Sequence, residues 1–432
     1  MRFARFRCIA PLLASCGLLL FSACNATDVP TATTVSSTEI TVSSESSATV
    51  TATATETTQT TETLIPITMI PTTIITTSQT VSVPQTTSET TPATTSESTT
   101  SATQTVPPET EPVATLDLYS ITWEPPTDSN ATKPLDIRTY DGYNQPCHPK
   151  VLYFPEGWNG YRYWMVYTPY PFCEDTLENP CLAVSDDGYN WSTPPGVTNP
   201  VTGLPPTYEN SAHYSDPHLV MNGKTMELWF RYNPSYGDGV NADSNEGIVF
   251  RIRSLDGVHW TQPEQLYQRR TGLDPVLSPA IILEDGVYTM WYAKRDGCLY
   301  RTTTTDGHIW TPLEKTDLSV YGRSIWHQDV IKTDLGYEIV FCARSMNAAS
   351  NLHGLALYYA ASTDGLHWTK PVCIVSPRTG TSALDNASIY RATIVKASGG
   401  YKIYYSSMSE NYIWKINLCE GPSIPELKGY GK

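Results

Sequence analysis

The sequence predicts an all-β protein: a five-bladed β-propeller with four antiparallel strands in each blade, preceded by a disordered stalk. One short motif, with a carboxylate, a glycine and a tryptophan at fixed spacing, occurs four times: SDDGYNW from Ser185, SLDGVHW from Ser254, TTDGHIW from Thr304 and STDGLHW from Ser362. Five pairs of strand-like segments also recur about every 50–70 residues. Four strands per repeat at this period, without helical periodicity, are typical of a propeller.

Each repeat supplies its strands in the same order. The first members of the pairs are HPKVLYF (from His148), DPHLVM (from Asp216), SPAIIL (from Ser278), HQDVIK (from His327) and RATIVK (from Arg391). The second members are GYRYWMVYT, TMELWFRYN, GVYTMWYAK, GYEIVFCAR and GYKIYYSS. A third strand precedes each turn motif, and a fourth begins near its tryptophan. The fifth unit lacks the motif, so we expect the segment LYSITWEPP, from Leu118, to close the ring as its outer strand.

The repeated aspartates are predicted to be structural. In an SxDG turn the Asp side chain caps backbone N–H groups, the Gly adopts positive φ, and the Trp packs between blades. A catalytic group would not be repeated at four equivalent positions on the rim. The residues concerned are Asp187, Asp256, Asp306 and Asp364.

The N-terminal part divides into a signal and a stalk. Residues 1–24 combine three arginines with a short apolar run, and the junction FSAC, ending at Cys24, resembles a bacterial lipobox. An ordinary secretory signal is the alternative. Residues 25–113 are rich in Thr and Ser, contain no Lys or Arg, and cannot bury enough apolar surface to fold. We therefore expect a propeller domain over residues 114–432, lipid-anchored at Cys24 to the cell membrane and facing the outside.

Charge and cysteine content exclude several classes of function. The net charge is −15, which argues against nucleic-acid binding. Seven cysteines remain after Cys24, without CxxC spacing, which argues against a metal cluster and a full disulfide framework. Cys173 and Cys181 could pair. No ligand spacing requires a metal or cofactor, although Ca²⁺ could occupy the channel.

The candidate site lies where the first strands begin, at the mouth of the central channel. Equivalent positions that differ in chemistry from blade to blade are expected to bind one asymmetric ligand. These positions hold Asp216 as a catalytic candidate and His148, Ser278, His327 and Arg391 as substrate-binding candidates. The second strands end at the same mouth and add Arg231, Lys294 and Arg344, a basic cluster suited to an anionic group on the ligand. His213 precedes Asp216, and Asp329 follows His327 by two residues.

The blades, the SDP at Ser215, the SPAII and MWYA segments and the recurrent DGxxW together resemble the five-bladed glycoside hydrolase propellers, which include arabinanases, β-xylosidases, invertases and levansucrases. The resemblance spans most of residues 140–410. It implies an oligo- or polysaccharide substrate, with Asp216 as base or nucleophile, Asp329 as a modulating carboxylate, and a Glu as acid.

The chain departs from this pattern in two places. His148 stands where the first blade of the family has an Asp, and no Glu begins a first strand; Glu209 and Glu264 are the nearest loop candidates for the acid. Hydrolysis of a glycosidic bond is the principal prediction. The alternatives are a non-catalytic carbohydrate-binding lipoprotein, a phosphorylase-like enzyme that uses the basic cluster, and a protein-binding adhesin. A second carboxyl group near Asp216 would favour hydrolysis, an isolated Asp216 would favour binding, and a mouth without polar groups would favour the adhesin.

Overall fold

The computed structural model describes residues 117–432, apart from 206–211, 234–247, 268–275, 347–351 and 398. The predicted signal, with Cys24, and the predicted stalk over 25–113 lie outside the described residues. Among the residues that are described, no helix has the length and apolar character needed to cross a membrane.

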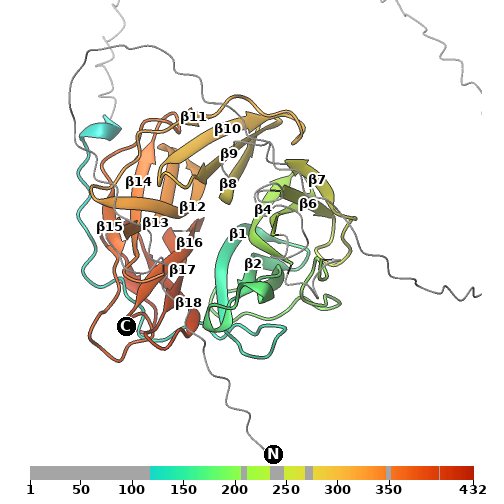
Figure 1. Ribbon diagram of the computed structural model, residues 1–432, viewed down its shortest axis with the longest axis horizontal. Helices are drawn as coiled ribbons and strands as arrows, with labels where there is room; N and C mark the ends of the chain where they lie inside the picture. The colour runs from blue at the N-terminus through green and yellow to red at the C-terminus, as the bar shows by residue number, and fades with distance from the viewer. Residues whose placement is uncertain (1–116, 206–211, 234–247, 268–275, 347–351, 398) are drawn as a thin grey trace, which may run out of the picture. The chain divides into compact units, whose positions relative to one another are not determined.

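Five antiparallel sheets form the blades, and the predicted propeller is confirmed (Figure 1). The innermost strands are β1 (Pro146–Trp158), β4 (His213–Asn222), β8 (Leu277–Glu284), β12 (Arg323–Thr333) and β16 (Ser388–Ala397). The second strands are β2 (Tyr161–Pro169), β5 (Thr225–Asn233), β9 (Val287–Ala293), β13 (Gly336–Ser345) and β17 (Gly400–Met408). The third strands are β3 (Cys181–Ser185), β6 (Ile248–Ser254), β10 (Leu299–Thr304), β14 (Ala356–Ser362) and β18 (Trp414–Gly421).

The outer strands are short. Blades 2 to 5 have β7 (Glu264–Tyr267), β11 (Glu314–Lys315), β15 (Val372–Val375) and β19 (Lys428–Gly429). In the first blade, the fourth position is reduced to one antiparallel bridge between Val184 and Ser192. The innermost strands contact one another in the order β1, β4, β8, β12, β16 and back to β1, so the ring is closed around its channel.

The ring closes differently from the expected way. Leu118–Ser120 form a short 3₁₀ helix, η1, that lies beside β14 of the fourth blade, rather than an outer strand of the fifth. The outer strand of the fifth blade is the C-terminal β19, and Asp128 forms a parallel bridge to Lys428 within it. The prediction failed because β-branched and aromatic residues alone do not determine which sheet edge a segment joins.

The hydrophobic cores lie between neighbouring blades. Trp164 of β2 and Phe230 of β5, for example, belong to one buried cluster shared by the first two blades. The apolar runs of the second strands are therefore covered on both faces, which explains why they lack polar alternation. This packing holds the innermost strands, and with them the channel mouth, in place.

The SxDG turns have the predicted structural role. In the second blade, the Oδ1 atom of Asp256 accepts hydrogen bonds from the backbone N–H groups of Val258 and His259, each at 2.8 Å. The other three turns repeat this pattern. Gly257 has a φ of +76°, and Trp260 packs against the core shared with the first blade. These aspartates are confirmed as turn residues.

The described cysteines are all free thiols, so the pairing of Cys173 with Cys181 is wrong. Cys181 is fully buried at the start of β3, and Cys173 accepts a hydrogen bond from the Trp414 indole at 3.4 Å. Both therefore act as small packing residues.

Candidate active site

Each innermost strand has a β-bulge at the same level, and the bulges bring the predicted site residues together. The ladders slip between Cys147 and Lys150, Ser215 and His218, Leu277 and Ala280, Ile325 and His327, and Ile389 and Ala392. In the first three blades the bulged residue has positive φ: 55° at His148, 50° at Asp216 and 48° at Ser278. Non-glycine residues rarely adopt this conformation, and such residues cluster at functional sites. In the fourth blade the slip falls at Trp326 and His327 is paired with Cys342, and in the fifth it falls at Tyr390 and Arg391. The five strand starts therefore share a bulge, but the bulged position is the same in the first three blades only.

Asp216 lies at the centre of this group and is almost fully buried, with 3% exposure. Its Oδ1 accepts hydrogen bonds from Ser278 Oγ at 2.8 Å and from Arg391 Nη1 at 3.2 Å. Its Oδ2 lies 3.2 Å from Arg231 Nε. Burial alone would raise the pKa of Asp216, but the charges of Arg231 and Arg391 outweigh it, so the pKa falls well below its ordinary value. Asp216 is therefore ionised at neutral pH.

A second buried carboxyl group, on Glu178, lies next to His148 and within the electrostatic influence of Asp216. Glu178 precedes β3, in the loop from the second to the third strand of the first blade, and is 8% exposed. Its Oε1 is 3.9 Å from His148 Nδ1. Burial raises the pKa of Glu178 well above its ordinary value, and the charge of Asp216 raises it further. Glu178 therefore keeps its proton where an exposed glutamate would have lost it.

Asn179 fastens the loop of Glu178 to the strand of Asp216. Its Oδ1 accepts a hydrogen bond from the backbone N–H of Tyr214, in β4, at 3.1 Å, and Asn179 has no exposed surface. A buried side-chain contact thus joins the loop that carries Glu178 to the strand that carries Asp216.

Two neutral histidines border the carboxyl pair. The rings of His148 and His327 have centroids 5.4 Å apart, and His327 Nδ1 is 3.7 Å from Asp216 Oδ1. Burial lowers the pKa of His148 to about 3 and lowers that of His327 well below its ordinary value. His148 Nδ1 is hydrogen-bonded to Thr168 Oγ1 at 2.8 Å. Both rings are therefore hydrogen-bonding groups without charge at neutral pH.

Asp329 lies further along its strand and has a full set of partners. It bonds Lys150 Nζ at 2.7 Å, Thr393 Oγ1 at 2.7 Å and the backbone N–H of Ile394 at 3.1 Å. Burial lowers the pKa of Arg391, and the charges of Asp216 and Asp329 offset this effect in part. The modulating role that the resemblance implies for Asp329 stays a prediction.

The remaining predicted residues have different surroundings. Lys294 lies over the ring of Tyr300 at 4.4 Å, and Arg344 over the ring of Trp326 at 4.8 Å. Of the predicted basic cluster, Arg231 is the member that contacts Asp216. His213 is buried at the first position of β4.

The sequence did not point to Glu178, and the two loop residues that it suggested lie elsewhere. Glu209 lies outside the described residues, and Glu264 is on the outermost strand β7, where it pairs with Arg251 and Arg253. Glu178 does not lie at the start of an innermost strand, so a comparison of those positions between blades does not include it. A usable signal was its position just before a third strand, because third strands begin at the end of the blade where second strands finish.

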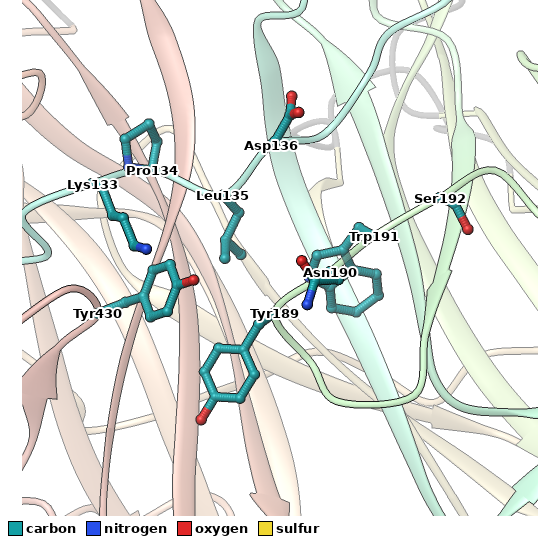
Figure 2. A pocket seen from close by; sticks show the side chains of 9 residues that line it. All are labelled: Lys133, Pro134, Leu135, Asp136, Tyr189, Asn190, Trp191, Ser192 and Tyr430. Atoms are coloured by element: carbon teal, nitrogen blue, oxygen red, sulfur yellow. The ribbon is translucent and has the colours of Figure 1, made fainter.

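In the described part of the chain, no three His, Cys, Asp or Glu side chains are grouped to hold a metal ion. A cavity of about 390 Å³ lies elsewhere, where the N-terminal segment, the first SxDG turn and the C-terminal segment meet (Figure 2). Tyr189 stacks on Tyr430 there with ring centroids 5.4 Å apart, and Lys133 Nζ lies 4.5 Å from the centre of the Tyr430 ring. No residue predicted for the site lines this cavity.

Comparisons with known proteins agree with this fold. The chain is 28% identical over 324 residues to an A type blood N-acetyl-α-D-galactosamine deacetylase of Flavonifractor plautii. The match covers 62% of this chain and 40% of that protein, so the chain spans less than half of the relative's length. No family model matches the chain.

Solved structures give the same result. An N-acetylgalactosamine deacetylase from F. plautii, in complex with blood group B trisaccharide, superimposes with a TM-score of 0.58 at 24% identity. The superposition covers 68% of this chain and 95% of that one. A glycoside hydrolase matches with a TM-score of 0.49 at 12% identity, over 68% of this chain and 92% of its own. The resemblance inferred from the sequence is confirmed at the level of fold: this chain is a five-bladed β-propeller of the kind found among carbohydrate-active proteins.

Proposed function

We propose that the protein is a hydrolase acting on glycans, and that its reaction is the removal of the acetyl group from an N-acetylated amino sugar. One observation carries the proposal: two buried carboxyl groups share the channel mouth, and their surroundings shift their pKa values in opposite directions. Such a pair provides an anion and a proton donor at the same pH, as acid–base hydrolysis requires.

The two groups have distinct roles in this reaction. Asp216 holds the attacking water and receives its proton while the water oxygen bonds to the acetyl carbon. Glu178 gives its proton to the nitrogen as the carbon–nitrogen bond breaks. The products are the free amine, which keeps the proton from Glu178, and acetic acid, which ionises to acetate. Asp216 then releases the proton that it took from water, and Glu178 takes up a proton from solvent, which restores the site. The relative from F. plautii, named as a deacetylase of this sugar class, supports the choice of the acetamide bond.

Hydrolysis of a glycosidic bond is the second candidate. Glycosidases also use a carboxylate with a protonated carboxylic acid, and Asp216 with Glu178 is such a pair. Binding without catalysis, adhesion and phosphorolysis have less support. Glu178 beside Asp216 argues against a site built for binding alone, and the polar groups converging on the mouth argue against an adhesin. Lys294 and Arg344 lie over aromatic rings, which gives the phosphorylase less support.

A product assay distinguishes the candidates. The full chain is incubated with α-glycosides of N-acetylgalactosamine, N-acetylglucosamine and galactose, and acetate and free sugar are quantified separately. We expect acetate from an acetylated sugar, with its glycosidic bond intact. Free sugar without acetate would show the second candidate to be correct, and binding without either product would contradict both.

We also propose that the propeller is anchored to the cell membrane, facing outside, through a lipid on Cys24. The FSAC junction and the apolar run before it support this proposal. Cys24→Ser should release the protein into the medium, as measured by immunoblots of membrane and medium fractions. Unchanged membrane retention would contradict the proposal.

A further inference from the structure

Ser278 links Asp216 to His327. It is fully buried, and its Oγ lies 2.8 Å from Asp216 Oδ1 and is also hydrogen-bonded to His327 Nδ1. An ionised carboxylate can only accept hydrogen bonds, and a serine hydroxyl has a single hydrogen to donate. The hydrogen of Ser278 is therefore committed to Asp216.

This commitment fixes the tautomer of His327. Because the Ser278 hydrogen points to Asp216, the contact between Oγ and Nδ1 is a hydrogen bond only if Nδ1 carries a hydrogen and donates it. The ring is neutral, since burial disfavours the charged form. In a neutral imidazole with a hydrogen on Nδ1, Nε2 has a lone pair and acts as an acceptor.

That acceptor is buried and unsatisfied. Within the described part of the chain, His327 Nε2 has no hydrogen-bond partner, and neither has Arg391 Nε, which can only donate. Both side chains lie next to the same carboxylate, with Arg391 Nη1 at 3.2 Å and His327 Nδ1 at 3.7 Å from Asp216 Oδ1. Unpaired buried polar groups are rare in folded proteins, and each needs an explanation.

We propose that His327 Nε2 accepts a hydrogen bond from the acetamido N–H of the bound sugar, and that Ser278 is the positioning residue that holds His327 in the required tautomer. An acetamido group offers one N–H and one carbonyl oxygen. The N–H matches the unpaired acceptor His327 Nε2, and the carbonyl oxygen matches the unpaired donor Arg391 Nε, both near the Asp216 carboxylate. This inference rests on the proposed function, because it names the chemical group by which that site distinguishes its sugar.

Sugar binding to a variant with slowed turnover tests whether His327 recognises the acetamido group. In a Glu178→Gln background, the affinity for methyl α-glycosides of N-acetylgalactosamine and of galactose is measured by calorimetry, with and without His327→Phe. The phenyl ring keeps the packing against Tyr390, whose ring centroid is 4.3 Å away. We expect the preference for the acetylated sugar to fall roughly 10- to 100-fold, the effect of one unpaired buried group, while the affinity for galactose hardly changes.

Ser278→Gly tests the positioning role without straining the backbone. Glycine readily adopts the φ of +48° found at this position, so the variant removes the hydroxymethyl side chain without adding backbone strain. Nitrogen-15 NMR should show His327 protonated at Nδ1 in the wild type and shifted toward the Nε2–H form in Ser278→Gly, with a matching loss of preference for the acetylated sugar. A wild-type ring protonated at Nε2 would overturn the inference.

The two proposals fail in different ways. An equal loss of affinity for both sugars in His327→Phe and in Ser278→Gly would overturn the acetamido assignment and leave the reaction untouched. A wild-type protein that binds the acetylated sugar through His327 but releases no acetate would overturn the reaction and leave the assignment in place.

Discussion

At the scale of single residues, the charge of Asp216 balances two guanidinium groups that are otherwise poorly solvated. Arg391 is 1% exposed, and its side chain has Asp216 and the carbonyl oxygen of Pro217 as hydrogen-bond acceptors. Removing one partner of a buried ion pair leaves the other charge uncompensated. The site is therefore part of the fold as well as of the chemistry.

We expect Asp216→Asn to lower the free energy of unfolding by roughly 3–5 kcal/mol, because Arg391 would keep its charge without a counter-ion. Urea denaturation at neutral pH measures this change. Asp136→Asn, at an exposed position with its side chain 79% accessible, is the control and should be nearly neutral. A variant as stable as the wild type would show that the ion pairs contribute little.

Glu178 should make stability depend on pH in the opposite sense from Asp216. The pKa of Glu178 is raised in the folded protein, so above about 4.5 the unfolded chain loses this proton while the folded chain retains it. Stability is then lost as pH rises from 4.5 toward the folded pKa. Asp216, with a lowered pKa, contributes stability above its ordinary pKa of 3.8 that is lost as pH falls through its folded pKa.

Glu178→Gln should therefore unfold at a higher urea concentration than the wild type at pH 7, and the two proteins should converge near pH 4. Denaturation curves at both pH values measure this difference. A wild-type advantage that grows from pH 4 to pH 7 would mean that Glu178 is ionised in the folded protein.

The strand starts were predictable from the sequence because the apolar positions of the repeats align them, while residues such as His148 and Asp216 differ in chemistry at the equivalent positions. Glu178 was not predictable in this way, since its raised pKa results from burial and from the charge of a residue in another blade. The tautomer of His327 likewise depends on contacts that join three blades.

At the scale of elements, the bulges and the SxDG turns divide the work of each blade. The bulge lies near the start of the innermost strand, at the channel mouth. The SxDG turn follows the third strand, at the opposite end of the blade. In the second blade a Cβ on Gly257, at φ +76°, would lie 2.2 Å from the Trp164 ring, so this glycine is required both by its backbone and by close packing.

Gly286 offers a matched comparison, because it has a φ of +79° and a Cβ added there would meet no neighbour within 4 Å. Gly286→Ala should cost about 1–2 kcal/mol of unfolding free energy for the left-handed backbone alone. Gly257→Ala should cost about 1–3 kcal/mol more, since Trp164 must move. Equal midpoints in thermal or urea denaturation would contradict this account of packing between blades.

The strands themselves were predictable, since their β-branched and aromatic runs are long and bounded by Gly and Pro. The bulges were not, although the His-Pro, Asp-Pro and Ser-Pro pairs at the first three strand starts mark them. A proline cannot donate to the ladder, so the pairing must be interrupted there.

At the scale of the whole molecule, five similar blades build one asymmetric site. The backbone repeats around the ring, while the side chains at the mouth provide one anion, one protonated acid, two guanidinium groups and two neutral histidines. The ring is closed by contacts between β1 and β16, and Asp128 adds a parallel bridge to Lys428 at the outer edge of the fifth blade. The repeats predicted the number of blades. They did not predict the outer strand of the fifth blade, because the sequence pattern suits the N-terminal segment and the C-terminal segment equally well.

The most direct test of the central claim is acetate release from an N-acetylgalactosamine glycoside by the full-length wild type and by Glu178→Gln. Glutamine keeps the size and neutrality of the protonated acid but has no proton to transfer. We predict a fall in turnover of roughly 10²- to 10⁴-fold, with sugar affinity maintained and a melting temperature at pH 7 no lower than that of the wild type. Glu264→Gln, on the outermost strand β7, is the control and should release acetate at the wild-type rate. Undiminished acetate release by Glu178→Gln would contradict the claim that Asp216 and Glu178 form the catalytic pair.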